Sequence, residues 1–443
     1  MKIGVIGAGR LGLCFALLVE RAGYEVLASD NRQDYIKDLR AGVIGTTEPN
    51  VHDLLWNSKN IEFTTDNRRV IRESDIIFTF VATPSLDDGS YDVSAVWNVV
   101  RDIKEEMTSI ANYAKSFVVG CTTNPGDCDK FKEQLPESVD VFYNPEFIAQ
   151  GTIVKDLINA DIVLICGYGH HIPELEKIYY GIQGSKKEPY IHNMSTKAGE
   201  IVKIAINTYL TTKISYANML GQVLYKSGLE DEIVDVLRAI GSDSRIGSKF
   251  LEASIGFGGS CFQKDIFNLV YLCQHFGLEE VADYWEQVVH MNDYQKRRFS
   301  RRIMEALFNT ASGKRIAVLG FAFKKDTNDT RESASIYVCR DLLQEQAKLA
   351  IYDPKVPAEQ IHADLQVAED SGGEIKICTD PYQATAGAHV VAVMTEWDEF
   401  CDLDYQRIYD SMLKPALIFD GRNILDLESL REIGFKAEGI GKG

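Results

Sequence analysis

A glycine-rich run near the middle of the chain ends in a cysteine that opens a predicted helix. Residues 256–260 read Gly-Phe-Gly-Gly-Ser, and Cys261 follows them. The glycines would give a ligand access to the backbone, and the start of a helix favours a thiolate over a thiol. A lone cysteine is more often an inert core residue, but this setting predicts that Cys261 is a nucleophile able to add to a carbonyl carbon.

Other polar residues lie where packing alone does not explain them. Lys203 and Asn207 are four residues apart, on one face of a long predicted helix, and could stabilise an oxyanion. The alternative for Lys203 is that its ammonium extends from apolar neighbours to water. Glu146 follows a predicted strand, at the edge where α/β proteins bind ligands, although a turn with an exposed acid is the simpler interpretation. Either Glu146 or Asp265 could act as a general base toward water.

Together these groups suit the oxidation of a primary alcohol to an acid. Two hydrides leave in such a reaction, and the intermediate aldehyde must not escape. A thiolate that adds to the aldehyde forms a thiohemiacetal, and loss of the second hydride gives a thioester that water then hydrolyses. This chemistry requires a nicotinamide within hydride reach of the carbon that is oxidised.

The start of the chain predicts a site for such a dinucleotide. A strand over residues 2–6 is followed by the run GAGRLG and by a helix over residues 11–22. Gly7 would allow the tight turn, Gly9 the approach of a pyrophosphate, and Gly12 the close packing of helix on strand. The start of the helix would offer its N–H groups and positive dipole to the phosphates.

An acidic residue completes this pattern. A second predicted strand, residues 25–29, ends at Asp30, whose carboxylate can accept hydrogen bonds from both ribose hydroxyls. A carboxylate at this place repels a 2′-phosphate, which favours NAD over NADP. Arg32 lies close enough to weaken that preference.

A strand over residues 315–319 begins a second strand, turn and helix, but its turn is different. Residues 320–326 read Gly-Phe-Ala-Phe-Lys-Lys-Asp, so aromatic side chains and lysines replace the small residues. This closes a dinucleotide crevice, but Lys324, Lys325 and Arg331 offer cations to another phosphate ligand. A solvated basic turn is the alternative. In so acidic a chain we interpret these residues as an anion site.

Composition limits the classes of protein that fit. The 443 residues include 47 Lys and Arg against 65 Asp and Glu, a formal charge of −18 that disfavours nucleic acid and anionic membranes as partners. No apolar run approaches the roughly 20 residues that span a bilayer, and residue 1 leads straight into a strand rather than a signal peptide. Nine scattered cysteines without metal-ligand spacing predict no zinc site, no disulfide scaffold and a reducing cytoplasm.

Strands that alternate with helices at both ends of the chain predict an α/β fold. We expect two Rossmann-like doubly wound domains, joined by a long central helix and a helical middle domain. The helix, over residues 195–226, would be about 45 Å long and would serve as a connector, a dimerisation spine or both. The expected domains are residues 1–194, 195–312 and 313–443. Predicted strands are residues 2–6, 25–29, 75–81, 116–119, 139–142, 315–319, 349–352, 390–394 and 416–419, and predicted helices are residues 11–22, 195–226, 230–240, 265–276, 281–307 and 333–346.

The motifs carry a resemblance that covers essentially the whole chain. The runs GAGRLG, VATPS, NPEF, KxxxN, GFGGSCFQKD, GFAFKKDTNDTRES and IFDGRN resemble the UDP-glucose dehydrogenase branch of the UDP-glucose/GDP-mannose dehydrogenase family. The resemblance implies an NAD-dependent, two-step, four-electron oxidation of UDP-glucose to UDP-glucuronate through Cys261. It also implies a homodimer or higher oligomer, an N-terminal NAD-binding domain and a C-terminal UDP-sugar-binding domain. The alternatives are another nucleotide sugar, such as a UDP-N-acetylhexosamine or GDP-mannose, and a non-catalytic nucleotide-sugar binding protein.

The same resemblance assigns roles to individual residues. The catalytic positions are Cys261, Lys203, Asn207, Asp265, Glu146 and Thr123. The NAD positions are Gly7, Gly9, Arg10, Leu11, Gly12, Asp30, Arg32, Thr83, Thr123, Gln150, Lys264 and Arg331. The substrate positions are Glu146, Phe147, Lys203, Asn207, Arg245, Phe250, Leu251, Ser254, Gly258, Phe262, Phe323, Lys324 and Arg422, where Lys324 would lie near the diphosphate and Arg245 would reach the neighbouring subunit's sugar site.

The chain departs from the usual family pattern at a few positions. Thr122-Thr123-Asn124-Pro125 replaces Ser-Thr-Val-Pro, and Gln150 replaces a common Glu near the nicotinamide. These departures are the only support for a non-catalytic binding protein, because every predicted reacting group is present. Phe262 and Gln263 after the cysteine favour the UDP-glucose branch over the mannose enzymes, which usually have Leu-Pro.

Overall fold

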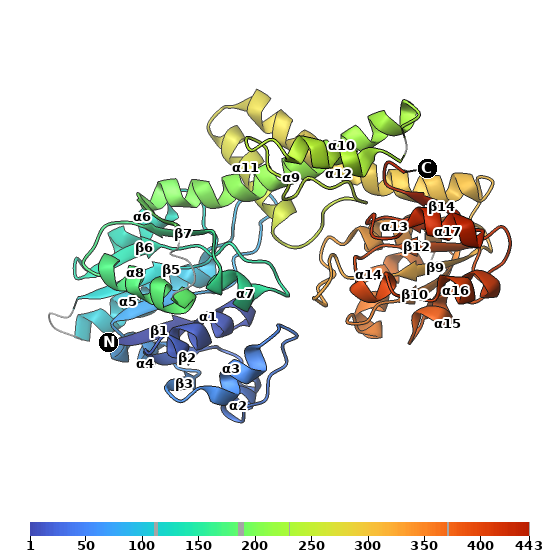
Figure 1. The fold of residues 1–443 in the computed structure, drawn as a ribbon. Coiled ribbons are helices and arrows are strands. Elements are labelled where there is room, and N and C mark those ends of the chain that lie inside the picture. The colour runs from blue at the N-terminus through green and yellow to red at the C-terminus, as the bar shows by residue number, and fades with distance from the viewer. Residues whose placement is uncertain (110–113, 185–189, 230, 370–371, 443) are drawn as a thin grey trace. The chain divides into compact units, whose positions relative to one another are not determined.

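A computed structural model describes the chain except for residues 110–113, 185–189, 230, 370, 371 and 443 (Figure 1). Its contacts divide the chain into two compact units, Met1–Ile206 and Asn207–Gly443. Each unit contains a β-sheet, and the boundary between the units falls within the long helix α9 (Thr196–Lys226).

The sheet of the first unit is ordered β3-β2-β1-β4-β5-β6-β7-β8. Its pairings are parallel except between β6 and β7, which are antiparallel. The order 3-2-1-4-5-6 is that of dinucleotide-binding sheets, with a topological switch between β1 and β4. The strands are β1 (Lys2–Ile6), β2 (Glu25–Ser29), β3 (Ile61–Thr64), β4 (Ile76–Thr79), β5 (Lys115–Val119), β6 (Val139–Tyr143), β7 (Ile162–Cys166) and β8 (Tyr190–Met194).

Helices cover both faces of this sheet. Val5 and Phe78 belong to a core formed with α1, α2, α3, α7 and α8, whereas their neighbours Ile6 and Ile77 belong to a core formed with α4, α5 and α6. Strands buried on both faces read as continuous apolar runs, which is why the central strands could be found from the sequence. The helices are α1 (Arg10–Arg21), α2 (Gln33–Arg40), α3 (Val51–Asn57), α4 (Asn67–Glu73), α5 (Ser94–Ser109), α6 (Asp127–Gln134), α7 (Ile153–Ile158) and α8 (Ile172–Gln183).

The second unit begins with helices and ends with a smaller sheet. After α9 come α10 (Ile233–Gly241), α11 (Phe262–His275) and α12 (Glu279–Ala306). The sheet is ordered β11-β10-β9-β12-β13-β14 and is parallel throughout. Its strands are β9 (Arg315–Leu319), β10 (Lys348–Tyr352), β11 (Glu374–Ile377), β12 (Val390–Val393), β13 (Leu417–Asp420) and β14 (Lys436–Gly439). Figure 1 shows the helices around it, which are α13 (Ala334–Gln344), α14 (Ala358–Glu369), α15 (Pro381–Thr385), α16 (Tyr405–Ser411) and α17 (Leu427–Ile433).

The expected fold class is confirmed, and every predicted strand is present. The predicted helix over residues 195–226 is α9, which differs by one residue at its start. The predicted start of α11 at Asp265 was wrong, because the helix already begins at Phe262 with Cys261 as its N-cap. The helix predicted over residues 230–240 begins at Ile233, and Glu230 lies outside the described residues. Strands β3, β7, β8, β11 and β14 were not among the predicted strands.

None of the helices in the described part of the chain combines the length and the apolar character that crossing a bilayer requires.

Candidate active site

The turn between β1 and α1 is too tight for side chains at two glycines. Gly7 has a φ of +91°, and a Cβ there would lie 2.8 Å from the Phe80 carbonyl oxygen. A Cβ at Gly12 would lie 2.1 Å from the Gly7 carbonyl oxygen. The amides of Gly7 and Ala8 both donate to the carbonyl of Ser29, over 2.9 and 2.8 Å. The fold itself therefore requires Gly7 and Gly12.

Gly9 is different because the fold leaves room for a side chain there. The atom nearest to a Cβ built on Gly9 is Nη2 of Arg32, at 3.8 Å. Gly9 is the N-cap of α1, so the backbone at this place faces the positive end of the helix dipole. A glycine that the fold does not need, at a helix start, fits the close approach of a pyrophosphate. These residues fit a bound dinucleotide.

Asp30 follows β2, and Arg32 binds its carboxylate through two hydrogen bonds. Nε of Arg32 donates to Oδ1 over 2.8 Å and Nη2 donates to Oδ2 over 2.9 Å. Asp30 is buried, whereas 56% of the Arg32 side chain is exposed, and its guanidinium lies 4.1 Å from the Tyr35 ring centroid. A ribose would meet a carboxylate whose cationic partner is exposed enough to move aside. The pairing occupies the arginine that could otherwise bind a 2′-phosphate.

The structure places the other predicted NAD residues of this unit around the same turn or on nearby loops. Nη1 of Arg10, the first residue of α1, donates to Oε1 of Gln150 over 2.6 Å, which brings together two residues 140 positions apart. Leu11 is half-buried beside Arg10, and Thr83 lies half-buried in the loop after β4. Thr123 follows β5 and is buried.

Glu146 takes part in a buried network with a tyrosine that the sequence analysis missed. The Tyr179 hydroxyl lies 2.6 Å from Oε1 of Glu146 and 2.5 Å from Oδ1 of Asn144. The Asn144 amide nitrogen donates to the carbonyl of Leu164 over 2.6 Å, which fixes the amide orientation. One hydroxyl proton therefore faces two acceptors. If Glu146 is neutral it can donate to Tyr179, which donates to Asn144; if it is ionised, Tyr179 donates to it and Asn144 Oδ1 loses its donor.

The balance between burial and this network places the pKa of Glu146 near neutrality. Burial raises the pKa of Glu146 to about 7, although the Tyr179 hydroxyl and the Lys203 ammonium oppose the rise. Nζ of Lys203 donates to the backbone carbonyl of Glu146 over 2.6 Å and lies 4.8 Å from the Phe147 ring centroid. Lys203 and Glu146, predicted separately, therefore meet within the first unit, and Glu146 can exchange a proton at physiological pH.

Cys261 lies at the start of α11, and its side chain is exposed. Gly259, two residues before it, has a φ of +86°, and its amide donates to the Arg331 carbonyl over 2.9 Å. A Cβ at Gly258 would lie 2.4 Å from the Glu332 carbonyl oxygen. The segment around Arg331 therefore packs against the glycines that precede the thiol. This contact brings together two parts of the chain that were predicted separately to bind ligands.

Asp265 lies one turn after Cys261 and is buried. Its Oδ2 accepts from Nδ2 of Asn207 over 2.6 Å, and its Oδ1 accepts from Nζ of Lys264 over 2.8 Å. Three predicted residues thus form one hydrogen-bonded cluster, with Asp265 one helical turn after Cys261. Because both carboxylate oxygens accept from neighbouring side chains, the geometry fits a positioning role for Asp265 better than that of a general base.

A cavity of about 300 Å³ in the second unit is lined by most of the predicted substrate residues. Phe262 packs edge to face against Phe250 and Phe257 in its wall. Arg422 donates to the carbonyls of Phe323 and Met394 over 2.7 and 2.8 Å, so it braces the basic turn. The predicted lining residues are Phe250, Ser254, Gly258, Phe262, Phe323, Lys324 and Arg422, and those that the sequence analysis missed are Ile214, Glu252, Ala253, Gly256, Phe257, Glu396 and Ile424.

Cys261, Asn207, Lys264 and Asp265 do not line the cavity, and neither do three further predicted residues of this unit. Leu251 is buried beside it, and Arg245 is exposed and paired with Asp243. Arg331 is exposed and paired with Asp329, and that hydrogen bond raises the pKa of the guanidinium. Among the missed residues, Glu396 lies just after β12, and the rule that ligands bind at the carboxyl ends of parallel strands could have found it.

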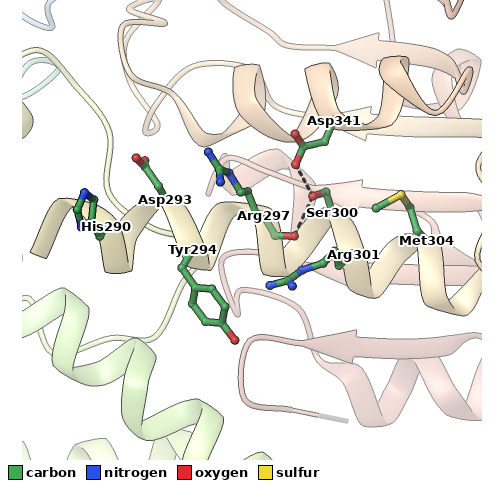
Figure 2. Close-up of a pocket in the computed structure, with 8 residues that line it drawn as sticks. All are labelled: His290, Asp293, Tyr294, Arg297, Ser300, Arg301, Met304 and Asp341. Atoms are coloured by element: carbon green, nitrogen blue, oxygen red, sulfur yellow. Dashed lines mark hydrogen bonds between the residues drawn. The ribbon is translucent and has the colours of Figure 1, made fainter. Parts of the chain in front are cut away.

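A second cavity, of about 490 Å³, lies along α12. Figure 2 shows its lining residues, with Ser300 of α12 directed at Asp341 of α13, to which it donates over 2.6 Å. Acidic and basic side chains are mixed, and none of the predicted site residues lines it, whereas seven of them line the first cavity. We therefore assign the candidate active site to the first cavity and its cysteine loop.

Family models match almost the whole chain in three consecutive parts. The NAD binding domain of the UDP-glucose/GDP-mannose dehydrogenase family matches residues 1–183, the central domain of that family matches residues 197–294, and its UDP binding domain matches residues 317–427.

Curated relatives match over the whole of this chain and nearly all of their own length. The chain is 43% identical to the UDP-glucose 6-dehydrogenase of Drosophila melanogaster, with 100% of this chain and 96% of that protein covered. It is 42% identical to the UDP-glucose 6-dehydrogenase of Gallus gallus, with 100% and 93% covered. Among solved structures, a UDP-glucose dehydrogenase from Pyrobaculum islandicum matches with a TM-score of 0.86 and 27% identity, over 100% of this chain and 98% of that one.

Proposed function

The chain belongs to the UDP-glucose/GDP-mannose dehydrogenase family, and we propose that it oxidises UDP-glucose to UDP-glucuronate in two successive steps. It is an NAD-dependent dehydrogenase, with NAD as its cofactor. Its UDP binding domain indicates a nucleotide sugar as the substrate class. The choice of UDP-glucose follows the names of the curated relatives and the Phe262-Gln263 pair after the cysteine.

One observation carries the proposal: an exposed thiol at a helix start, one turn before Asp265, whose carboxylate binds Asn207 and Lys264. The next residue, Phe262, lines the cavity that also contains Lys324. A binding protein has no use for an accessible thiol in this position, whereas an oxidation that must retain an aldehyde does.

The proposed steps use this chain's own groups to hold the substrate through both oxidations. When bound, NAD accepts one hydride in each oxidation. Sγ of Cys261 attacks the aldehyde carbon, and the new C–S bond holds a thiohemiacetal whose oxidation gives a thioester. Water then attacks the carbonyl carbon, and cleavage of the C–S bond releases the carboxylate and regenerates the thiol. Lys203 and Asn207 stabilise the oxyanions.

We propose that Glu146 accepts the proton of the attacking water. Its pKa of about 7 lets it ionise under physiological conditions, and its protonated form remains stable in the network with Tyr179. Thr123 acts beside that water. The base for the first oxidation is Lys203, Glu146 or a bound water.

The wider arrangement follows the sequence analysis. We propose domains over residues 1–194, 195–312 and 313–443, a homodimer or higher oligomer, and a place in the cytoplasm. The remaining predicted NAD and substrate positions keep their proposed roles, including Arg245 as a residue that reaches a neighbouring subunit.

The test is the amount of NADH formed per UDP-glucose consumed. We expect two equivalents of NADH and stoichiometric UDP-glucuronate. Absence of NADH with UDP-glucose, together with turnover of a UDP-N-acetylhexosamine or GDP-mannose, would assign the enzyme to that substrate instead. Absence of turnover with every nucleotide sugar, with binding retained, would favour the non-catalytic alternative.

Cys261→Ser tests the nucleophile separately. Serine keeps the size but is a far weaker nucleophile at neutral pH, so we expect the complete reaction to fall by about a thousandfold or more. Product analysis should show a stalled second oxidation or a trapped intermediate. Full four-electron turnover by this variant would refute the role of Cys261.

A further inference from the structure

A buried carboxylate on α9 holds the loop that contains Thr123. Glu200 is fully buried in the first unit. Its Oε1 accepts from the Thr123 hydroxyl over 2.8 Å and from the Cys128 amide over 3.0 Å, and its Oε2 accepts from the Gly126 amide over 2.5 Å. Three donors from a short stretch of chain thus converge on one side chain that lies 72 to 77 residues away in the sequence.

Two of these donors belong to the start of a helix. Gly126 is the N-cap of α6, has a φ of +97° and makes no side-chain cap bond of its own. The amides of Gly126 and Cys128 would lack partners inside that helix, and Glu200 accepts from both. A carboxylate is also favoured here by the positive end of the helix dipole. The pKa of Glu200 lies above its usual value, because burial raises it by more than the hydrogen bonds with Gly126, Cys128 and Thr123 lower it.

The same part of α9 also holds a second predicted catalytic loop. Lys203, three residues after Glu200, donates to the backbone carbonyl of Glu146. The first turns of α9 therefore bind the loop after β5 through Glu200 and the loop after β6 through Lys203. Lys203 belongs to the predicted site, but no predicted role exists for Glu200.

We propose that Glu200 is a positioning residue for the reaction, because it fixes the Thr123 loop and commits the Thr123 hydroxyl proton. With that proton donated to Glu200, the oxygen of Thr123 can only accept a hydrogen bond from a water or a cofactor group. The inference rests on the proposed function in so far as Thr123 acts beside the catalytic water and NAD.

A purely structural tie exists next to it and serves as the matched control. Thr196, at the first residue of α9, donates through Oγ1 to Oδ1 of Asp129 in α6 over 2.7 Å. This bond also joins α9 to α6, but it does not involve the Thr123 loop. Thr196→Val removes the bond and keeps the side-chain shape.

The central variant is Glu200→Gln, whose amide group must face one of the donors and release it. We expect kcat to fall by about ten- to a hundredfold, with KM for UDP-glucose within about twofold. Amide hydrogen exchange should become faster in residues 122–128, and NAD should bind more weakly. Thr196→Val should leave kcat within about twofold. An equal loss in Thr196→Val, or an unchanged kcat in Glu200→Gln, overturns the proposal.

A double-mutant cycle with Thr123→Val decides whether Glu200 acts through Thr123. We expect Glu200→Gln to reduce kcat much less in the Thr123→Val background than in the wild type. Equal reductions in both backgrounds overturn the proposal. If Glu200→Gln fails to fold, Thr123→Ser, which keeps the hydroxyl, should retain most of the kcat that Thr123→Val loses, and equal losses in the two would refute the role.

Amide exchange and NAD affinity are measured without a sugar, so they remain decisive if UDP-glucose is not the substrate. Faster exchange and weaker NAD binding in Glu200→Gln, without any UDP-glucose turnover by the wild type, would support Glu200 and sink the proposed function. If the wild type oxidises UDP-glucose but Glu200→Gln shows unchanged amide exchange and NAD affinity, the proposed function stands and the role of Glu200 is refuted.

Discussion

The two sheets of this protein share the same first elements, but the residues after their first two strands bind different partners. After β1 and after β9 the chain turns at a glycine of positive φ, +91° at Gly7 and +94° at Gly320. In both units the second strand is followed by an aspartate, Asp30 in the first and Asp353 in the second. The topology of strand, turn, helix and strand is therefore shared.

The two aspartates differ in what they bind. Asp30 is paired with an exposed arginine, whereas Oδ2 of Asp353 accepts from the amides of Phe321 and Ala322 over 2.7 and 3.0 Å and from the indole N–H of Trp397 over 3.1 Å. The protein itself thus occupies the place of a dinucleotide in the second unit. A Rossmann-like topology makes a dinucleotide site only when the turn and the acid are left for the ligand.

The largest expected effect tests the open turn of the first unit. Gly9→Val places a branched side chain where the fold has room but a pyrophosphate would lie. We expect NAD affinity to fall by about a hundredfold, or ~2.7 kcal/mol, with the melting temperature unchanged. Calorimetric titration with NAD and thermal unfolding measure both. An equal loss of stability would show that Gly9 serves the fold, as Gly12 does.

The next test addresses the closed turn of the second unit. In Asp353→Asn an amide group must replace one acceptor oxygen and face N–H donors, so buried donors lose their partners. We expect the free energy of unfolding to fall by about 2 kcal/mol while KM for NAD stays the same. Denaturant titration with parallel kinetics provides the check. A change in NAD kinetics would contradict the view that Asp353 is purely structural.

The corresponding aspartate-to-asparagine change in the first unit should alter NAD binding and leave stability nearly unchanged. Asp30→Asn removes the negative charge that repels a 2′-phosphate and releases Arg32. We expect KM for NAD to rise by about tenfold, or ~1.4 kcal/mol, and the preference for NAD over NADP to narrow, with little change in stability. Kinetics with both cofactors measure the result. An unchanged ratio would mean that the Asp30–Arg32 pair does not select the cofactor.

The smallest expected effect concerns the hydrogen-bond network of Glu146, Tyr179 and Asn144, which belongs to the first unit. If ionised Glu146 is the base, kcat should rise with pH through about 7, and Glu146→Gln should abolish that rise. In Asn144→Leu, ionisation of Glu146 no longer costs Asn144 a hydrogen bond, so the apparent pKa should fall by about 0.7 units, or ~1 kcal/mol.

The control for this last test is Tyr179→Phe, which removes the hydroxyl that couples the two residues. Asn144→Leu should then cause no further shift of the pH profile. A shift of the same size in both backgrounds would show that Asn144 acts on Glu146 by another route.

Patterns local in the sequence predicted much of this architecture. The turn after β1, the nine predicted strands and the length of α9 all follow from runs of about four to 32 residues, where glycine position and apolar periodicity decide the structure. The position of Cys261 at a helix start follows from the same kind of local signal, although the helix itself was predicted to begin at Asp265 rather than at Phe262. In contrast, β8 (YIHNM) is polar and largely exposed, so no pattern distinguishes it from a loop.

The parts of the site that the sequence did not reveal depend on contacts between distant residues. Tyr179 meets Glu146 across 33 positions, and Glu200 meets Thr123 across 77. Trp397 reaches Asp353 across 44 positions. Each of these residues looks like an ordinary core or helix residue alone, because only tertiary packing brings its partner within hydrogen-bond distance.

The internal hydrogen bonds of Asp353 also limit how the second turn could change by successive mutations. Reopening the second turn to a nucleotide would require a change at Asp353 and compensating changes around it, because loss of its carboxylate leaves the amides of Phe321 and Ala322 and the indole N–H of Trp397 without their acceptor. A variant that lost the carboxylate before these donors gained another acceptor would be less stable than the present protein. The internal bonds of Asp353 therefore oppose a gradual conversion of the second turn into a dinucleotide site.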